Sequence, residues 1–155
     1  MKLLMLVNPM AGKKQGRRVA EQALNEFRRH HVEVETIYSE YHGHLIQVAE
    51  REVKGRWDGI VAVGGDGTLF EVINGMMQGV PSLPIPLGVI PVCTGNSFSR
   101  DLNIKTHEDA IAKIVAGVTR KVDLGFCPAA DLSFYFINIL GFGFVAAVAQ
   151  KASKY

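Results

Sequence analysis

The segment with the clearest chemical potential is Val63–Thr68, which reads Val-Gly-Gly-Asp-Gly-Thr. It follows the apolar run Gly59–Val63 and precedes a helical pattern, so it lies where a buried strand passes into a helix. Three glycines in four positions let the backbone approach a ligand without interference from Cβ atoms. The exposed N–H groups and the positive end of the helix would then hold an anion such as phosphate. The alternative is a tight turn in which Asp66 or Thr68 caps the helix.

Asp66 is an unusual residue to place beside a bare phosphate, because both groups are negatively charged. A divalent cation resolves the conflict. Mg²⁺ is usually held by one or two carboxylates together with the phosphates of a substrate. The sequence around Asp66 therefore predicts a phosphate-bearing ligand that binds together with Mg²⁺.

A second segment, Asn8–Lys14, follows the apolar run at the start of the chain. Its small residues precede two lysines, and Lys13 or Lys14 could act as a point charge toward phosphate. The segment therefore allows a second phosphate cradle. It is equally well explained as a turn followed by solvent-exposed lysines.

A third segment, Pro91–Arg100, follows another apolar run and is rich in polar side chains. Thr94, Asn96 and Ser97 carry hydrogen-bonding groups, and Arg100 could pair with a phosphate or a carboxylate. A capped helix start with a surface arginine is the alternative. There is no G-x-x-x-x-G-K-[ST] sequence, so the chain is not a P-loop nucleotide-binding protein.

Short apolar runs alternate with amphipathic helical stretches along the chain. This pattern predicts an α/β fold with a mostly parallel sheet flanked by helices. The predicted strands are Lys2–Asn8, Val32–Tyr38, Gly59–Val63, Leu87–Ile90, Arg120–Leu124 and Tyr135–Leu140, and the predicted helices are Arg17–His30, Leu45–Val53, Thr68–Gln78 and Glu108–Ala116.

Ligands of such sheets bind beyond the carboxyl ends of the strands. Four segments should therefore meet at one edge of this sheet. They are Asn8–Lys14, Gly64–Thr68, Pro91–Arg100 and Asp123–Gly125.

The composition narrows the possible classes of protein. The 155 residues are 48% hydrophobic and 21% charged, which is typical of a globular domain and excludes wholesale disorder. The net charge of +2 is too small to indicate nucleic acid as a partner. Two cysteines are too few for a disulfide framework or a four-ligand zinc site. A cytoplasmic protein is the expectation, because the apolar run Leu3–Val7 is too short for a secretory signal.

One apolar stretch needs a separate interpretation. Leu132–Gln150 carries no charge and approaches the roughly 20 residues that a membrane-spanning helix needs. Ser133, Asn138 and two glycines interrupt it, so a buried strand, a glycine turn and a helix start are the better interpretation. With no convincing anchor, we expect any membrane contact to be peripheral.

Taken together, these segments resemble a known family, the diacylglycerol kinase catalytic domain, which includes bacterial lipid kinases and sphingosine and ceramide kinases. The resemblance lies in the order and spacing of four motifs across nearly the whole chain. They are Asn8-Pro-Met-Ala-Gly12, Gly64-Gly-Asp-Gly-Thr-Leu-Phe-Glu71-Val-Ile-Asn74-Gly75, Pro91–Arg100 and Val122-Asp-Leu-Gly125.

The resemblance implies that the γ-phosphoryl group of ATP is transferred to a lipid hydroxyl with Mg²⁺. It also implies the α/β domain that the family shares with NAD kinases and phosphofructokinases. Residues implied to contact the nucleotide are Asn8, Pro9, Met10, Ala11, Gly12, Ser39, Gly64, Gly65, Asp66, Gly67, Thr68, Leu69, Phe70, Glu71 and Thr94. Asp66 and Asp123 are implied to join a network of magnesium and water.

The chain also departs from the family pattern. Cys93 replaces a glycine, Ser97 replaces an aspartate common in bacterial members, Phe70 replaces a common asparagine, and Val145 stands where many relatives have aspartate. Ser97 and Phe70 favour relatives that act on sphingoid lipids, and the identity of the lipid stays open.

Family members are usually about twice as long as this chain. Their second, β-rich domain contributes the carboxylate thought to deprotonate the lipid. We therefore expect residues 1–125 to form the nucleotide-binding domain and 126–155 to begin an incomplete second domain. The general base is expected beyond Tyr155, and the isolated chain should be weak or inactive as a kinase. Two other functions remain open, an NAD kinase-like phosphotransferase and a non-catalytic nucleotide-binding module. The oligomeric state stays open.

Overall fold

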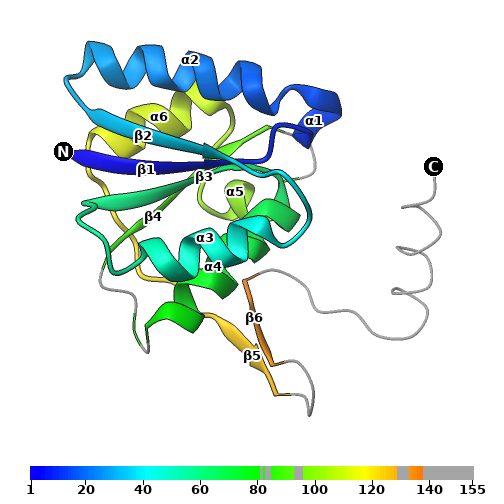
Figure 1. The fold of residues 1–155 in the computed structure, drawn as a ribbon. Coiled ribbons are helices and arrows are strands. Elements are labelled where there is room, and N and C mark those ends of the chain that lie inside the picture. The colour runs from blue at the N-terminus through cyan, green and yellow to red at the C-terminus, as the bar shows by residue number, and fades with distance from the viewer. Residues whose placement is uncertain (81, 83–84, 93–95, 129–132, 138–155) are drawn as a thin grey trace.

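A computed structural model shows a parallel sheet between two layers of helices (Figure 1). It describes residues 1–80, 82, 85–92, 96–128 and 133–137. The sheet has the strand order β2-β1-β3-β4. Its strands are β1 (Lys2–Val7), β2 (Glu33–Tyr38), β3 (Gly59–Gly64) and β4 (Leu87–Pro91). The α/β fold with a parallel sheet flanked by helices is therefore confirmed.

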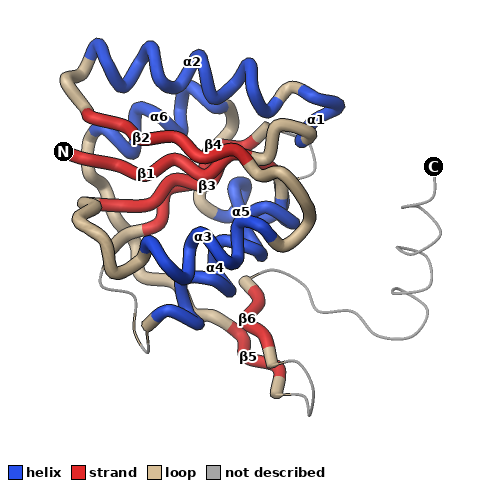
Figure 2. The backbone as a smooth tube through the Cα atoms, in the orientation of Figure 1, coloured by secondary structure: helices blue, strands red, loops and turns tan. Residues whose placement is uncertain are grey.

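The helices of the described residues divide between the two faces of the sheet. They are α1 (Ala11–Lys14), α2 (Gly16–Arg29), α3 (His44–Glu52), α4 (Asp66–Gly79), α5 (Ser97–Asp101) and α6 (His107–Val115). The connection from β1 to β2 leads toward one edge of the sheet. The connections from β2 to β3 and from β3 to β4 lead toward the opposite edge. Because such crossovers are right-handed, α2 must lie opposite α3 and α4. Figure 2 shows this, with α6 on the side of α2.

The central strands are buried on both faces, as expected for a sheet covered by helices on each side. On β1, Leu3, Met5 and Val7 join the core beneath α2 and α6. Leu4 and Leu6 join the core beneath α3 and α4. All five side chains are at most 3% exposed. The apolar run that begins the chain is thus a strand with no solvent-facing side, which explains why it shows no polar alternation.

Helices α3 and α4 approach each other closely because small residues line their contact. A Cβ built on Gly75 would lie 2.2 Å from the carbonyl oxygen of Ile46. The same atom on Gly79 would lie 2.5 Å from the carbonyl oxygen of Glu50. Any side chain at these two positions would push α3 away from α4. This contact matters for the site, because α3 and α4 both begin at the carboxyl edge of the sheet.

All eight predicted elements of the first 116 residues are confirmed, with ends within two residues of the predicted ones. The prediction of a strand at Arg120–Leu124 is wrong, because this segment has no regular structure. Only Val122 and Leu124 are apolar there, and residues 116–123 are exposed, so a strand would have no face to bury. Strand formation begins one residue later, in an antiparallel hairpin of β5 (Gly125–Cys127) and β6 (Phe134–Phe136).

The hairpin lies beside α4, at the end of the molecule away from α2 (Figure 1). It carries aromatic side chains on both strands, and the rings of Phe126 and Tyr135 lie 4.9 Å apart. The sequence had predicted a strand at Tyr135–Leu140; β6 occupies its start, and residues 138–140 lie outside the described part. No helix among the described residues is long and apolar enough to cross a membrane. The described part of Leu132–Gln150 is residues 133–137, which include β6.

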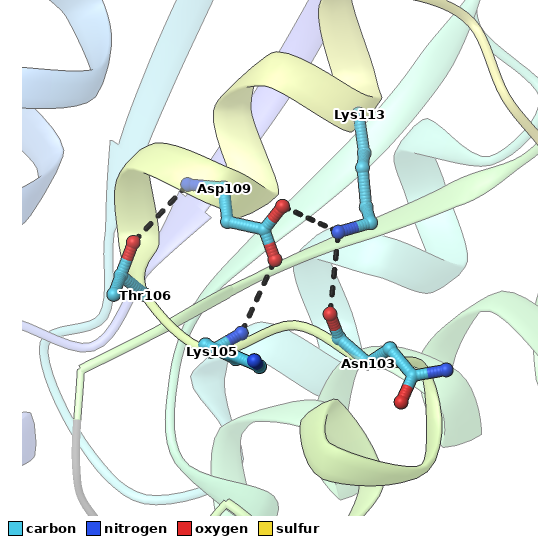
Figure 3. A network of polar contacts seen from close by, with 5 residues as sticks. All are labelled: Asn103, Lys105, Thr106, Asp109 and Lys113. Atoms are coloured by element: carbon cyan, nitrogen blue, oxygen red, sulfur yellow. Dashed lines mark hydrogen bonds and ion pairs between the residues drawn. The ribbon is translucent and has the colours of Figure 1, made fainter.

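A polar network fixes the start of α6 (Figure 3). Thr106 caps the helix by accepting a hydrogen bond from the Asp109 backbone N–H at 3.2 Å. The Asp109 carboxylate accepts from the Lys113 ammonium and, at 3.2 Å, from the Lys105 backbone N–H. These bonds, chiefly the one from Lys113, lower the pKa of Asp109.

The lowered pKa predicts an acid-sensitive contribution to stability. A carboxylate whose pKa is lower in the folded than in the unfolded chain stabilises the fold above its unfolded pKa, about 3.9. That stabilisation is lost as the pH falls through the folded pKa. The variant Asp109→Asn should therefore be less stable than the parent at pH 7, and the difference should be smaller at pH 3, below the unfolded pKa. Urea unfolding at both pH values measures this, with Asp101→Asn as a control. A constant difference at both pH values would contradict the prediction.

Candidate functional site

The loops that follow β1, β3 and β4 meet at one edge of the sheet, as predicted. The backbone N–H of Asn8 donates to the carbonyl of Val63 at 3.0 Å. The N–H of Val92 donates to the carbonyl of Gly64 at 3.1 Å. These bonds extend the sheet by one residue beyond β1 and β4 and bring the starts of all three loops into register. The fourth predicted segment, Asp123–Gly125, is not placed there by a strand, because no strand precedes it.

The loop after β1 is packed tightly against the loop after β4. Gly12 has a left-handed backbone with φ +57°, and a Cβ there would lie 2.7 Å from the carbonyl oxygen of Val92. Lys13 and Lys14 are also left-handed, with φ of 56° and 69°. That conformation costs a non-glycine residue roughly 1–2 kcal/mol. A loop that retains such strain is held by its surroundings, and such loops are typical of functional sites.

The loop after β3 opens helix α4. Gly65 precedes the helix with no side-chain cap, so the first N–H groups of α4 are not capped by a side chain. A Cβ on Gly64 would lie 2.2 Å from the Thr68 hydroxyl oxygen, so only glycine fits beneath that side chain. A Cβ on Gly67 would meet no atom within 4 Å. Gly64 is therefore required by packing, whereas Gly67 leaves open space beside the helix N-terminus.

Asp66 connects this loop to the loop after β4. Its Oδ2 accepts a hydrogen bond from the backbone N–H of Ser97 at 3.2 Å, at the start of α5. The side chain is half-buried. The carboxylate therefore lies at the N-terminus of α4 and holds the first residue of α5 beside it.

A cavity of about 420 Å³ lies at this edge, between the starts of α3 and α4. Volumes of a few hundred Å³ are typical of small-molecule sites. The predicted residues that line it are Asn8, Met10, Ala11, Ser39, Gly65, Gly67, Thr68 and Glu71. Two segments distant in sequence, the loop after β1 and the start of α4, thus face a common space.

The other predicted residues that the structure describes, Asp66 among them, do not line the cavity. Pro9 and Gly12 belong to the loop after β1, and Gly64 ends β3. Leu69 is buried in the core with Ile73, Val89 and Phe98. Phe70 is 39% exposed, and its ring lies 5.8 Å from that of Phe134. Thr94 lies outside the described residues.

The two predicted magnesium residues differ in setting. Asp66 is half-buried at the start of α4, and Asp123 is exposed on the segment between α6 and β5. Among residues 1–128 and 133–137, apart from the undescribed positions, no group of three or more His, Cys, Asp or Glu side chains could hold a metal ion. Mg²⁺ does not need such a group when a nucleotide supplies phosphate oxygens and water completes the shell. A single carboxylate such as Asp66 is compatible with a Mg²⁺ site of that kind.

Four lining residues were not predicted: Glu40, Tyr41, His42 and Leu45. All belong to the loop after β2 or to the start of α3. The rule that ligands bind beyond the carboxyl ends of strands applies to this loop as well. Ser39 entered the prediction only through the family resemblance, although the rule alone would have identified the whole loop.

Two residues of the motif that follows the glycine loop make structural contacts. The Asn74 side chain is 2% exposed. Its amide nitrogen donates to the carbonyls of Phe70 and Tyr135 at 2.8 and 2.9 Å, and its oxygen accepts from the N–H of Tyr135 at 2.8 Å. Asn74 thus pairs with β6 as a neighbouring strand would. Gly75 lets α3 approach α4.

Known proteins resemble this chain in both sequence and fold. The sequence model of the diacylglycerol kinase catalytic domain matches residues 2–127. The chain belongs to this family. The match includes the four strands of the sheet and the three loops that meet at its carboxyl edge.

Individual relatives are lipid kinases by name. The chain is 28% identical to sphingosine kinase 1 of Arabidopsis thaliana, over 99% of this chain and 34% of the plant protein. It is 36% identical to a diacylglycerol kinase of Staphylococcus epidermidis, over 94% of this chain and 45% of the bacterial protein. A diacylglycerol kinase structure from Bacillus anthracis has a TM-score of 0.68 and 27% identity, over 79% of this chain and 44% of that one. The diacylglycerol kinase-like chain thus spans less than half the length of each of these relatives.

Proposed function

We propose that this chain is the nucleotide-binding part of a lipid kinase, which transfers the γ-phosphoryl group of ATP to a lipid hydroxyl. One observation carries the proposal. In a chain of this kinase family, the glycine-rich loop after β3 and the loop after β1 line the same cavity at the carboxyl edge of the sheet. Residues 1–125 would form this part, and residues 126–155 would begin a second domain. Contact with the lipid surface would be peripheral.

The cavity suits a nucleotide for physical reasons. The uncapped N-terminus of α4 presents backbone N–H groups and the positive end of the helix to an anion. Gly65 and Gly67 expose this backbone, and Gly67 leaves room for a ligand atom. Phosphoryl transfer needs mainly positioning and neutralisation of charge, which such groups supply. We assign the phosphates to Asn8–Gly12 and Gly65–Thr68.

Magnesium would be held beside the phosphates. Asp66, and Asp123 through water, would provide carboxylate oxygens, and the ion would neutralise charge on the transferred group. The hydrogen bond from Ser97 keeps the Asp66 carboxylate at the start of α4, next to the proposed phosphate position. No residue of the described chain is assigned as the base that deprotonates the lipid.

The proposed role of Asp66 can be tested with a change that keeps its structural bond. Asn in place of Asp66 still offers an oxygen to the Ser97 N–H but has no charge for the cation. We expect Asp66→Asn to weaken Mg-ATP binding about tenfold, or ~1.4 kcal/mol, with little change in thermal stability. Calorimetric titration with and without Mg²⁺ measures the effect. If the variant binds ATP as tightly as the parent and responds equally to Mg²⁺, Asp66 does not serve the metal.

The acceptor is tested by phosphoryl transfer. The 155-residue chain is incubated with γ-labelled ATP and Mg²⁺, in parallel with diacylglycerol micelles, sphingosine micelles and NAD. We expect labelled lipid at a rate far below that of a full-length relative, and no labelled NADP. Labelled NADP without labelled lipid would contradict the proposal. Transfer to lipid at the rate of a full-length relative would refute the requirement for a second domain.

A further inference from the structure

The carboxylate of Glu71 makes contacts that its place in the glycine motif does not explain. Glu71 lies on α4 and is 8% exposed. Its Oε1 accepts from the backbone N–H of Gly43 at 3.0 Å, and its Oε2 accepts from the N–H of Leu45 at 3.3 Å. The Nδ1 atom of His42 lies 2.9 Å from Oε1. Both carboxylate oxygens are thus directed at the start of α3.

This arrangement caps one helix with a side chain from another. The first N–H groups of a helix have no partner within the helix. Gly43, at the position before α3, has no side chain that could supply one, and its backbone is left-handed with φ +84°. Glu71 supplies the acceptor instead. The positive end of α3 in turn stabilises the buried negative charge.

The segment that Glu71 holds forms one wall of the cavity. Ser39, Glu40, Tyr41 and His42 line the cavity in sequence. At one end, the N–H of Ser39 donates to the carbonyl of Val7 at 2.8 Å, which fixes the segment to β1. At the other end, Gly43 is fixed to Glu71. The position of the wall relative to α4 therefore depends on this carboxylate.

Contacts with the first turn of α3 fix the side chains of the Ser39–Gly43 wall. The N–H of Glu40 donates to Nδ1 of His44 at 3.1 Å. The Tyr41 ring stacks on His44 with centroids 4.9 Å apart, and its hydroxyl donates to Gln47 at 3.0 Å. Tyr41 and Glu40 thus take their places from the first turn of α3, which Glu71 caps.

We propose that Glu71 is a positioning residue, which holds the Ser39–Gly43 wall against α4 and so shapes the ligand cavity. It acts through the Gly43 and Leu45 amides rather than as a metal ligand. A cation beside it would compete with the N–H donors and meet the positive end of α3. This inference rests on the proposed nucleotide site, and it adds which residue fixes the position of the Ser39–Gly43 wall of that site.

The test replaces Glu71 by glutamine, which keeps the size of the side chain. The glutamine keeps one side-chain oxygen, which can still accept one of the two backbone hydrogen bonds. Its NH₂ group replaces the other oxygen and faces a backbone N–H, so two donors meet and that hydrogen bond becomes a repulsive contact. We expect Glu71→Gln to weaken Mg-ATP binding five- to twentyfold. Hydrogen exchange at the Gly43 and Leu45 amides should quicken at least tenfold, while the β1 and β3 amides stay protected.

A matched control separates positioning from general loss of stability. Asn74 is also buried and hydrogen-bonded, and it lies one turn further along α4, but its contacts lead to β6 and away from the cavity. Asn74→Ala should lower stability and leave both ATP affinity and the exchange of Gly43 and Leu45 near the parent values. Equal loss of affinity in the two variants at equal destabilisation would overturn the proposal.

The remaining outcomes are distinct. If Glu71→Gln loses affinity while Gly43 and Leu45 stay protected, Glu71 contacts the ligand directly and the proposal is wrong. Unchanged or tighter binding would also overturn it. If the parent does not bind ATP, the proposed function is wrong, but hydrogen exchange still tests the positioning role of Glu71. Faster exchange at Gly43 and Leu45 in Glu71→Gln would support that role, and unchanged exchange would refute it.

Discussion

Replacing Gly67 by leucine is expected to weaken ATP binding by at least tenfold, or ~1.4 kcal/mol, while the fold becomes no less stable. Gly67 lines the cavity in the first turn of α4, and a Cβ there meets no atom within 4 Å. The new Cβ therefore meets no protein atom, and we expect the rest of the side chain to occupy ligand space. Leucine favours a helix more than glycine does, which adds about 0.5–1 kcal/mol of stability.

A loss of binding without a loss of stability would show that the substitution acts on the ligand site and not through unfolding. ATP titration and thermal unfolding of the same sample measure both quantities. Gln78→Leu provides the control, because it places an exposed leucine at the far end of the same helix. Parent-like ATP affinity in Gly67→Leu would mean that the ligand lies elsewhere.

Replacing Asn74 by alanine should cost about 2–4 kcal/mol of unfolding free energy, among the largest effects of any single change. The change removes three hydrogen bonds, and it leaves the N–H and carbonyl of Tyr135 without their partner. A hairpin of two three-residue strands is not stable alone. We expect the β5–β6 hairpin to separate from α4 while the four-stranded sheet remains.

Hydrogen exchange and urea unfolding test this prediction together. The amides of β5 and β6 should lose protection in Asn74→Ala, and those of β1 and β3 should keep it. Asn25→Ala is the control, since Asn25 makes a surface hydrogen bond to Arg28 on α2. If protection in the hairpin is unchanged, the aromatic contacts hold the hairpin in place, and Asn74 does not.

The order of strands and helices could be predicted because the hydrophobic pattern of each segment agrees with the way that segment is buried in the fold. The run Leu3–Val7 is apolar throughout, as a strand buried on both faces must be. In α2, Val19, Ala23 and Phe27 recur at helical spacing, and all three are buried. The glycine motif then predicted where the sheet edge opens onto α4.

The parts that sequence did not predict depend on contacts between distant residues. The role of Glu71 could not be predicted, because the helix end that it caps lies 28 residues earlier in the chain. The contact of Asn74 with Tyr135 spans 61 residues. Arg120–Leu124 was wrongly predicted for the opposite reason. Its local pattern resembled a strand, but residues 120–123 are exposed and only Leu124 packs against a core cluster. The short α1 and α5 were missed because they follow tertiary contacts of the loops.

These contacts give the glycine motif a second role beside ligand binding. Gly64 lets Thr68 pack, Asp66 holds the start of α5, and Glu71 holds the start of α3. One stretch of sequence therefore builds the cavity edge and fixes the elements around it. Losses of binding in this stretch must be compared with stability before a direct role is assigned.

The most direct test is a calorimetric titration of the 155-residue chain with ATP, first with Mg²⁺ and then with the metal chelated. The account predicts saturable binding at one site, tighter with Mg²⁺ and weakened at least tenfold in Gly67→Leu. An absence of binding heat at all temperatures tried, or equal binding by the parent and Gly67→Leu, would contradict it.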